Sequence, residues 1–163
     1  MMQARGMTWK TILVPHDFSA SANHATAIAR DEAKAHGGTI VLLHVIDLPY
    51  QLSPDAVIVP AETGAPISVK QYAINSAEAH LQDIADRLAK DGATAIGVIT
   101  IGTPVDEINR VVGEHKIDLV VMGTHGRTGI RHLMAGSVAE RVVRTCRVPV
   151  LTIRHPEKAD KAE

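Results

Sequence analysis

Aromatic residues and cysteine are scarce in this chain of 163 residues. Phe, Trp and Tyr make up only 2% of it, which leaves few rings on which the bases of a single-stranded nucleic acid could stack. The one cysteine, Cys146, excludes an intrachain disulfide and any zinc or iron–sulfur site that needs several cysteines. We therefore expect Cys146 to be a small buried apolar residue.

An excess of charge and a long apolar run are also missing. Lys and Arg number 17 and Asp and Glu 18, so the net charge of −1 gives no field that would hold a polyanion, and no nucleic-acid partner is expected. No segment approaches the roughly 20 apolar residues that span a bilayer. The N-terminal sequence lacks the apolar core of a secretory signal, so we expect a cytoplasmic protein without a membrane partner.

The chain does contain an alternation of short apolar runs with amphipathic segments. Because aromatics are so few, the core must consist of Val, Ile, Leu and Ala, as in helices packed on a buried parallel sheet. Apolar runs predict strands at residues 10–15, 39–46, 95–101, 117–122 and 148–153. Caps and periodicity predict helices from Ser19 or Ser21 to Gly37, and at 68–90, 103–115 and 137–146. This alternation is typical of an α/β fold, here a single doubly wound domain with helices on both faces of a five-stranded parallel sheet.

Two helix ends are predicted from single residues. Gly92 stands where a glycine cap would end the helix at 68–90. Thr103 is expected to cap the following helix, with Pro104 in its first turn and Asp106 three residues after the cap.

Residues 47–66 interrupt the alternation. The segment contains four prolines and is predicted to be a long irregular connection, of a length that is uncommon unless it is functional or mobile. Three interpretations stay open for it: it covers a ligand, it contacts a partner, or it is merely disordered.

A glycine-rich segment follows the fourth predicted strand. Gly123, Gly126 and Gly129 recur at intervals of three, and Gly136-Ser137 opens the last helix. Glycines let backbone N–H groups approach an anion, and a helix N-terminus adds free N–H groups and the positive end of its dipole. The pattern indicates a phosphate-binding loop; a loop whose glycines only make turns is the alternative. It is neither the P-loop pattern nor the dinucleotide-binding pattern.

At these residues the sequence resembles the universal stress protein family. Gly123-x2-Gly126-x9-Gly136-Ser137 is similar to the ATP-binding signature of that family, G-x2-G-x9-G-[ST]. The resemblance covers roughly residues 8–154 and includes, in the family's order, 10–19 (KTILVPHDFS), 41–47 (VLLHVID), 102–104 (GTP), 118–123 (DLVVMG) and 148–151 (VPVL). It implies one universal stress protein domain at 8–154 between flexible termini at 1–7 and 155–163. It also implies an adenine nucleotide alpha hydrolase-like sheet in the order 3-2-1-4-5.

The resemblance further implies where ATP would bind. The implied nucleotide-binding residues are Pro15, Asp17, Val45, Met122, Gly123, Gly126, Arg127, Gly136, Ser137 and Val138. The first four would surround the adenine, and the others would meet the ribose and the phosphates, with Arg127 as a charged partner.

Asp17 is the most informative polar residue outside the loop. Its carboxylate would accept a hydrogen bond from the ribose or base, or help to hold Mg²⁺ or Mn²⁺ on the phosphates; a helix cap is the alternative. The nine histidines show no metal-ligand spacing. We expect them, including His16 and His44 at strand ends near the site, to be surface or hydrogen-bonded residues.

The sequence favours a nucleotide-dependent regulatory or stress-response module over an enzyme. No catalytic residue is assigned, because a P-loop lysine and a separate acidic motif are missing. Slow ATP hydrolysis, binding of AMP or cyclic AMP, and action by protein contact alone stay open, and the downstream protein partner is not identified. The apolar strand at 148–153 would form a sheet edge, and the resemblance implies that it pairs with its own copy in a homodimer.

Overall fold

The computed structural model describes residues 8–48, 53–124 and 137–154. The flexible termini predicted at 1–7 and 155–163 lie outside the described residues, as do Gly126, Arg127 and Gly136. The strands of the main sheet are β1 (Thr11–Pro15), β2 (Thr39–Ile46), β5 (Thr94–Ile101), β6 (Leu119–Gly123) and β7 (Val150–Ile153). The helices are α1 (Ala20–His36), α2 (Val69–Lys90), α3 (Pro104–Glu114) and α4 (Ser137–Thr145).

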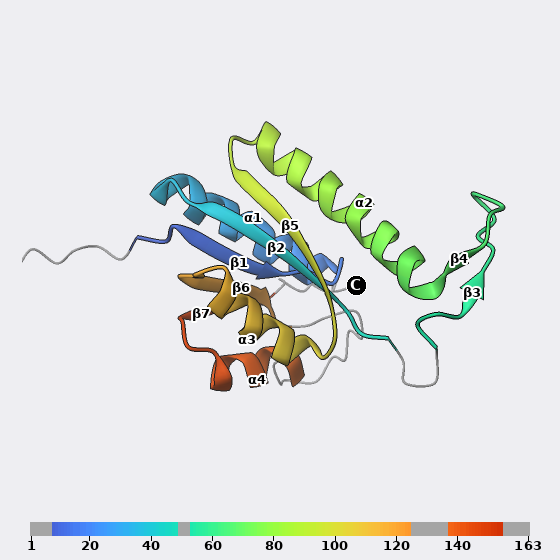
Figure 1. The fold of residues 1–163 in the computed structure, drawn as a ribbon. Coiled ribbons are helices and arrows are strands. Elements are labelled where there is room, and N and C mark those ends of the chain that lie inside the picture. Colours follow the sequence, from blue (N-terminus) through green and yellow to red (C-terminus); the bar gives the residue numbers. More distant parts are fainter. Residues whose placement is uncertain (1–7, 49–52, 125–136, 155–163) are drawn as a thin grey trace, which may run out of the picture.

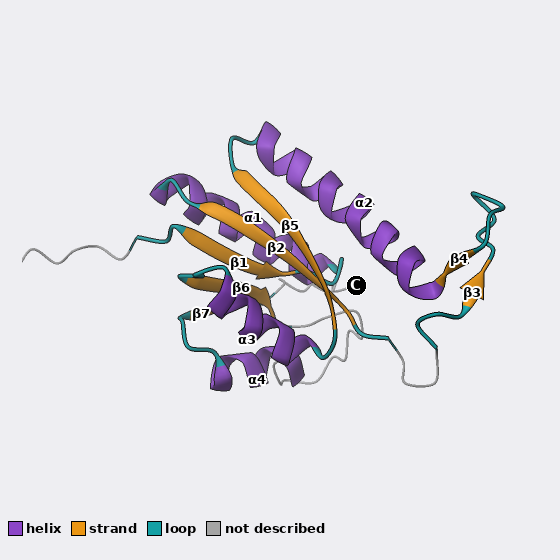
Figure 2. Cartoon of the chain, viewed as in Figure 1, coloured by secondary structure: helices purple, strands orange, loops and turns teal. Residues whose placement is uncertain are grey.

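The five main strands form one parallel sheet in the order β5-β2-β1-β6-β7. When the five strands of this sheet are numbered by themselves, without β3 and β4, this is the predicted order 3-2-1-4-5. The α/β fold class is confirmed. Figure 2 shows the strands as a twisted central layer with helices on either side. No helix in the described parts of the chain has the length and apolar character to cross a membrane.

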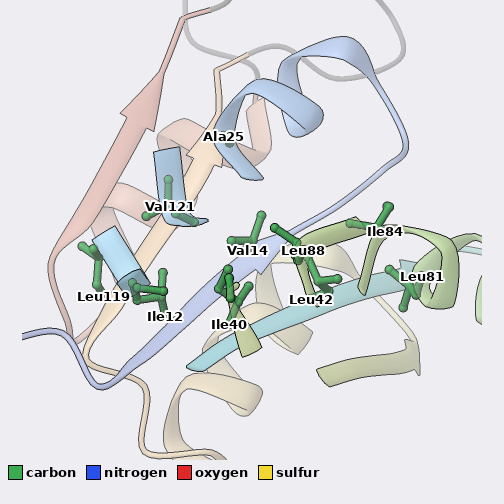
Figure 3. Packing of buried hydrophobic residues seen from close by; sticks show 13 residues of the cluster. Ile12, Val14, Ala25, Ile40, Leu42, Leu81, Ile84, Leu88, Leu119 and Val121 are labelled. Atoms are coloured by element: carbon green, nitrogen blue, oxygen red, sulfur yellow. The ribbon is translucent and has the colours of Figure 1, made fainter. Parts of the chain in front are cut away.

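Two apolar clusters hold the helices on the two faces of the sheet. The first joins alternate residues of the strands to α1 and α2, through residues such as Ala25 and Leu81. Figure 3 shows Val14 and Leu42 of neighbouring strands beside Leu81, Ile84 and Leu88 of α2 in this cluster. The second joins the other strand residues to α3 and α4. The fully buried side chains are aliphatic, and each Ile, Leu or Val contributes about 1.5–3 kcal/mol by leaving water.

The helix ends follow ordinary capping chemistry with one correction to the prediction, at Thr103. Ser19 caps α1, and Gly37 ends it in the left-handed conformation that glycine favours (φ 60°). α2 ends at Lys90 with Asp91 at its C-cap, and Gly92 follows in the left-handed conformation (φ 79°) as the predicted glycine cap. Thr103 is the N-cap residue of α3, as predicted, but its side chain makes no capping hydrogen bond.

Residues 47–66 form the predicted irregular connection in the part described, except for the two residues of β3. A small antiparallel hairpin joins β3 (Val57–Ile58) to β4 (Ile67–Ser68). Figure 1 places it at the N-terminal end of α2, projecting away from the main sheet. Strands of only two residues carry too short an apolar pattern to be read from sequence, and four prolines in the segment conceal them further.

Candidate functional site

The chain reverses its winding direction at the boundary between β1 and β6. From β1 the sheet extends through β2 to β5 on one side and through β6 to β7 on the other. Ligands of open parallel sheets bind outside the carboxyl ends of the strands at such a reversal. The predicted location between the first and fourth strands of the sheet is therefore the place where the fold favours a site.

The two halves of the sheet separate at this point. Pairing between β1 and β6 ends at Leu13↔Val120. Beyond it, β1 stays beside β2 as far as Pro15↔Leu43, and the His16 N–H donates to the Leu43 carbonyl at 2.7 Å. On the other side, β6 stays beside β7, and the Thr124 N–H donates to the Ile153 carbonyl at 2.9 Å. The carboxyl ends of β1 and β6 thus belong to diverging pairs of strands.

Four of the predicted nucleotide-binding residues gather on one face of the sheet, three on its strands and one on α4. Met122 is a buried member of the cluster beneath α3 and α4, and Val45 and Val138 are half-buried against the same cluster. Pro15 is half-buried at the end of β1, two residues after Leu13 of that cluster. Because side chains alternate along a strand, Pro15 is on the same face as Leu13. Apolar side chains therefore adjoin the carboxyl ends of β1, β2 and β6 on this face.

Asp17 follows β1 and shapes the turn into α1. One carboxylate oxygen, Oδ1, accepts a hydrogen bond from the Ser19 N–H at 3.1 Å, and the Ser19 hydroxyl oxygen accepts one from the Ala22 N–H at 3.2 Å. Ser19, rather than Asp17, is the N-cap of α1. In the described part of the chain no group of three or more His, Cys, Asp or Glu residues could hold a metal ion. A divalent ion at Asp17 would therefore need phosphate oxygens and water as its other ligands.

His16 is buried within this turn, with an exposed fraction of 3%. Its Nδ1 accepts a hydrogen bond from the Phe18 N–H at 3.1 Å, so the neutral ring carries its proton on Nε2. Burial lowers the pKa of His16 from 6.5 to about 4, against the opposing effects of the Asp17 carboxylate and the Asn23 side chain. The ring is neutral near pH 7; its Nδ1 is hydrogen-bonded as expected, whereas its buried Nε2 has no hydrogen-bond partner among the described residues.

Sequence reasoning missed an aromatic cluster beside this turn. The Phe18 ring stacks on His44 of β2, with centroids 4.5 Å apart, and lies 5.0 Å from the ring of His80 of α2 and 5.3 Å from that of His16. Phe18 also adopts a φ of 65°, which is rare for a bulky residue. The spacing of these residues in the sequence gives no signal for the cluster, because three separate segments, the turn, β2 and α2, supply the rings.

Gly123 ends β6 and is packed closely against α1. A Cβ added at this position would lie 2.3 Å from the Ser21 Oγ and 3.0 Å from the Ser21 carbonyl carbon. The sequence pattern predicted a glycine here for the approach of a phosphate; the contact with α1 is a second requirement that the pattern did not reveal. A substitution at Gly123 would therefore disturb the packing of α1 as well as any bound anion.

The N-terminal end of α4 packs on the same face of the sheet as Val45 and Met122. Ser137 is the first residue of this helix, as predicted, and Val138 anchors its first turn against the second apolar cluster. The first N–H groups of a helix lack partners within the helix and attract anions. Together with the diverging strands and the apolar surface, α4 completes an arrangement that suits a ligand with one flat apolar end and one anionic end.

Comparison with known proteins agrees with this architecture. The model of the universal stress protein family matches residues 8–154. The chain is 31% identical over 151 residues to the universal stress protein MJ0531 of Methanocaldococcus jannaschii, covering 92% of this chain and 85% of the relative. The structure of MJ0577, from the same organism, superimposes with a TM-score of 0.76 at 26% identity, over 92% of this chain and 99% of that one. A universal stress protein solved in complex with cAMP has a TM-score of 0.61 at 25% identity, over 91% and 98%. The chain therefore belongs to the universal stress protein family.

Proposed function

We propose that this protein binds ATP in the crevice between β1 and β6 and acts as a nucleotide-dependent regulatory or stress-response module. The observation that carries the proposal is the divergence of β1 and β6, together with the apolar face on which Val45, Met122 and the first turn of α4 pack. The relative that is solved with cAMP supports an adenine nucleotide as the class of ligand.

In this proposal the nucleotide lies across the carboxyl ends of the strands. The adenine contacts Pro15, Val45 and Met122, and the Asp17 carboxylate accepts a hydrogen bond from the ribose or base. Backbone N–H groups receive the phosphates, assisted by Arg127, at Gly123, Gly126, Gly136, Ser137 and Val138. Mg²⁺ or Mn²⁺ binds with the phosphates. Most of its other ligands are then water molecules, and few are protein side chains.

A nucleotide with a single phosphate is the second candidate ligand. The cAMP complex of the relative favours it specifically. The same backbone amides serve one phosphate or three, so AMP or cyclic AMP would use the same crevice and change only the signal that the protein reads. Slow hydrolysis of ATP is a further alternative for the same site.

Titration calorimetry with ATP, AMP and cyclic AMP, each with and without Mg²⁺, tests this proposal. The wild-type protein should bind ATP at one site per chain. Gly136→Ala should weaken that binding at least about tenfold, because a methyl group would occupy space that the phosphates need. Gly113→Ala is the matched control: a Cβ at Gly113, in α3, would meet no atom within 4 Å. Equal affinity in the Gly136→Ala variant would contradict the proposed phosphate-binding loop.

A further inference from the structure

We propose that Phe18 and His44 are positioning residues of the nucleotide site: their stacked rings hold the turn between β1 and α1 in the shape that presents Pro15 and Asp17 to the nucleoside. The proposal rests on the proposed function and adds to it two residues that do not themselves touch the ligand.

The side chain of His44 holds the turn by a hydrogen bond to the backbone of the turn. Its Nδ1 lies 2.7 Å from the His16 carbonyl oxygen. A carbonyl only accepts, so Nδ1 must carry the proton and donate it to that oxygen. His16 stands between Pro15 and Asp17, and its carbonyl carbon is bonded to the Asp17 nitrogen. The His44 imidazole therefore holds the His16–Asp17 peptide group, which lies between the two residues predicted to contact the ligand.

Phe18 holds the same turn from its other side. Its ring stacks on that of His44, with centroids 4.5 Å apart and planes inclined by 30°. Its backbone is held at a φ of 65°, and a bulky residue keeps such a conformation only where its surroundings enforce it. Those surroundings are the rings of His16, His44 and His80, which contact Phe18 from the turn, from β2 and from α2.

The hydrogen bonds inside the turn make its shape depend on this anchorage. The Phe18 N–H donates to His16 Nδ1 and the Ser19 N–H donates to Asp17 Oδ1, so side chains rather than a strand ladder close the turn. If the Phe18 ring loses its stacking partner, nothing in this hydrogen-bond pattern by itself keeps φ positive. A relaxed turn would displace Asp17 relative to Pro15, which the pairing of β1 with β2 holds in place.

The location of the pair argues for positioning rather than for core packing alone. Phe18 and His44 are half-buried and stand at the carboxyl end of the sheet, whereas the fully buried residues lie deeper. The loss of either ring should therefore act on the geometry of the strand ends more than on the stability of the whole sheet.

Three variants at these two positions test the proposal by their affinity for ATP, measured by calorimetry. His44→Leu removes the donor to the His16 carbonyl and should weaken ATP binding about tenfold or more. His44→Asn keeps an amide N–H near the position of Nδ1 but loses the ring that stacks on Phe18, so it should bind ATP more tightly than His44→Leu and more weakly than the wild type. Phe18→Leu removes the stacked ring and should weaken binding as His44→Leu does. His115→Leu, at the far end of α3, is the matched control and should bind ATP as the wild type does.

The affinity for inorganic tripolyphosphate separates a positioning role from a merely structural one. A structural defect would weaken the binding of tripolyphosphate and ATP alike. Tripolyphosphate engages the phosphate-binding loop but has no nucleoside for the Asp17 turn to meet. His44→Leu should therefore keep its affinity for tripolyphosphate while losing affinity for ATP. Equal loss for both ligands, or no loss for ATP, would overturn the positioning role while the proposed function stands. If the wild-type protein binds neither ligand, the proposed function itself fails.

Discussion

At the scale of single residues, His16 makes the stability of the protein depend on pH. Its pKa is about 4 in the folded protein and 6.5 in an exposed histidine, so between these values the unfolded chain binds the proton more tightly. Stability is fully retained above pH 6.5 and falls as the pH decreases towards 4, by about 3 kcal/mol in total from this residue. Protonation at Nδ1 would also remove the acceptor of the Phe18 N–H.

Denaturant unfolding of wild type and His16→Asn at several pH values between 4 and 7 checks this expectation. Asn keeps a hydrogen-bond acceptor near the position of Nδ1 but does not titrate. The free energy of unfolding of the variant should therefore fall less steeply with decreasing pH than that of the wild type, whatever its absolute value at pH 7. Parallel curves for the two proteins would show that His16 does not carry the pH dependence.

At the scale of the elements, two helix caps of similar sequence should differ in strength. The Ser68 hydroxyl oxygen accepts a hydrogen bond from the Gln71 N–H at 3.1 Å, whereas the Thr103 side chain makes no capping bond to α3. Ser68→Ala should lower the free energy of unfolding by about 1 kcal/mol, and Thr103→Ala by clearly less. Chemical denaturation of both variants measures the difference, and equal losses would contradict the assignment of the caps.

The elements also show what sequence reasoning can and cannot supply. Apolar runs and caps identified the five main strands and four helices, because each element carries an apolar run or stripe over several residues. The hairpin of β3 and β4 was missed because two-residue strands bury no such face. The ring cluster of Phe18 was missed because a positive φ at phenylalanine is imposed by tertiary contacts and leaves no local pattern. At Gly123 the pattern identified the residue but not its packing against Ser21.

At the scale of the whole molecule, we propose that the edge strand at 148–153 pairs with its own copy in a homodimer. Within the described sheet β7 pairs only with β6, and Leu151 on it is 39% exposed. An apolar edge strand favours association unless it is covered. Leu151→Arg should therefore shift the protein to a monomer in multi-angle light scattering. Ile96→Arg, on the opposite edge strand β5, is the matched control and should leave the dimer intact; a dimer that survives Leu151→Arg would contradict the β7 interface.

The most direct test of nucleotide binding is mass analysis of whatever small molecule the freshly purified protein releases on denaturation, together with its molar ratio to the chain. The account predicts an adenine nucleotide, ATP first among them, at close to one per chain. Release of AMP or cyclic AMP at that ratio would keep the crevice between β1 and β6 as the site and change the ligand. Release of no nucleotide, with no binding when ATP and Mg²⁺ are added, would contradict the central claim.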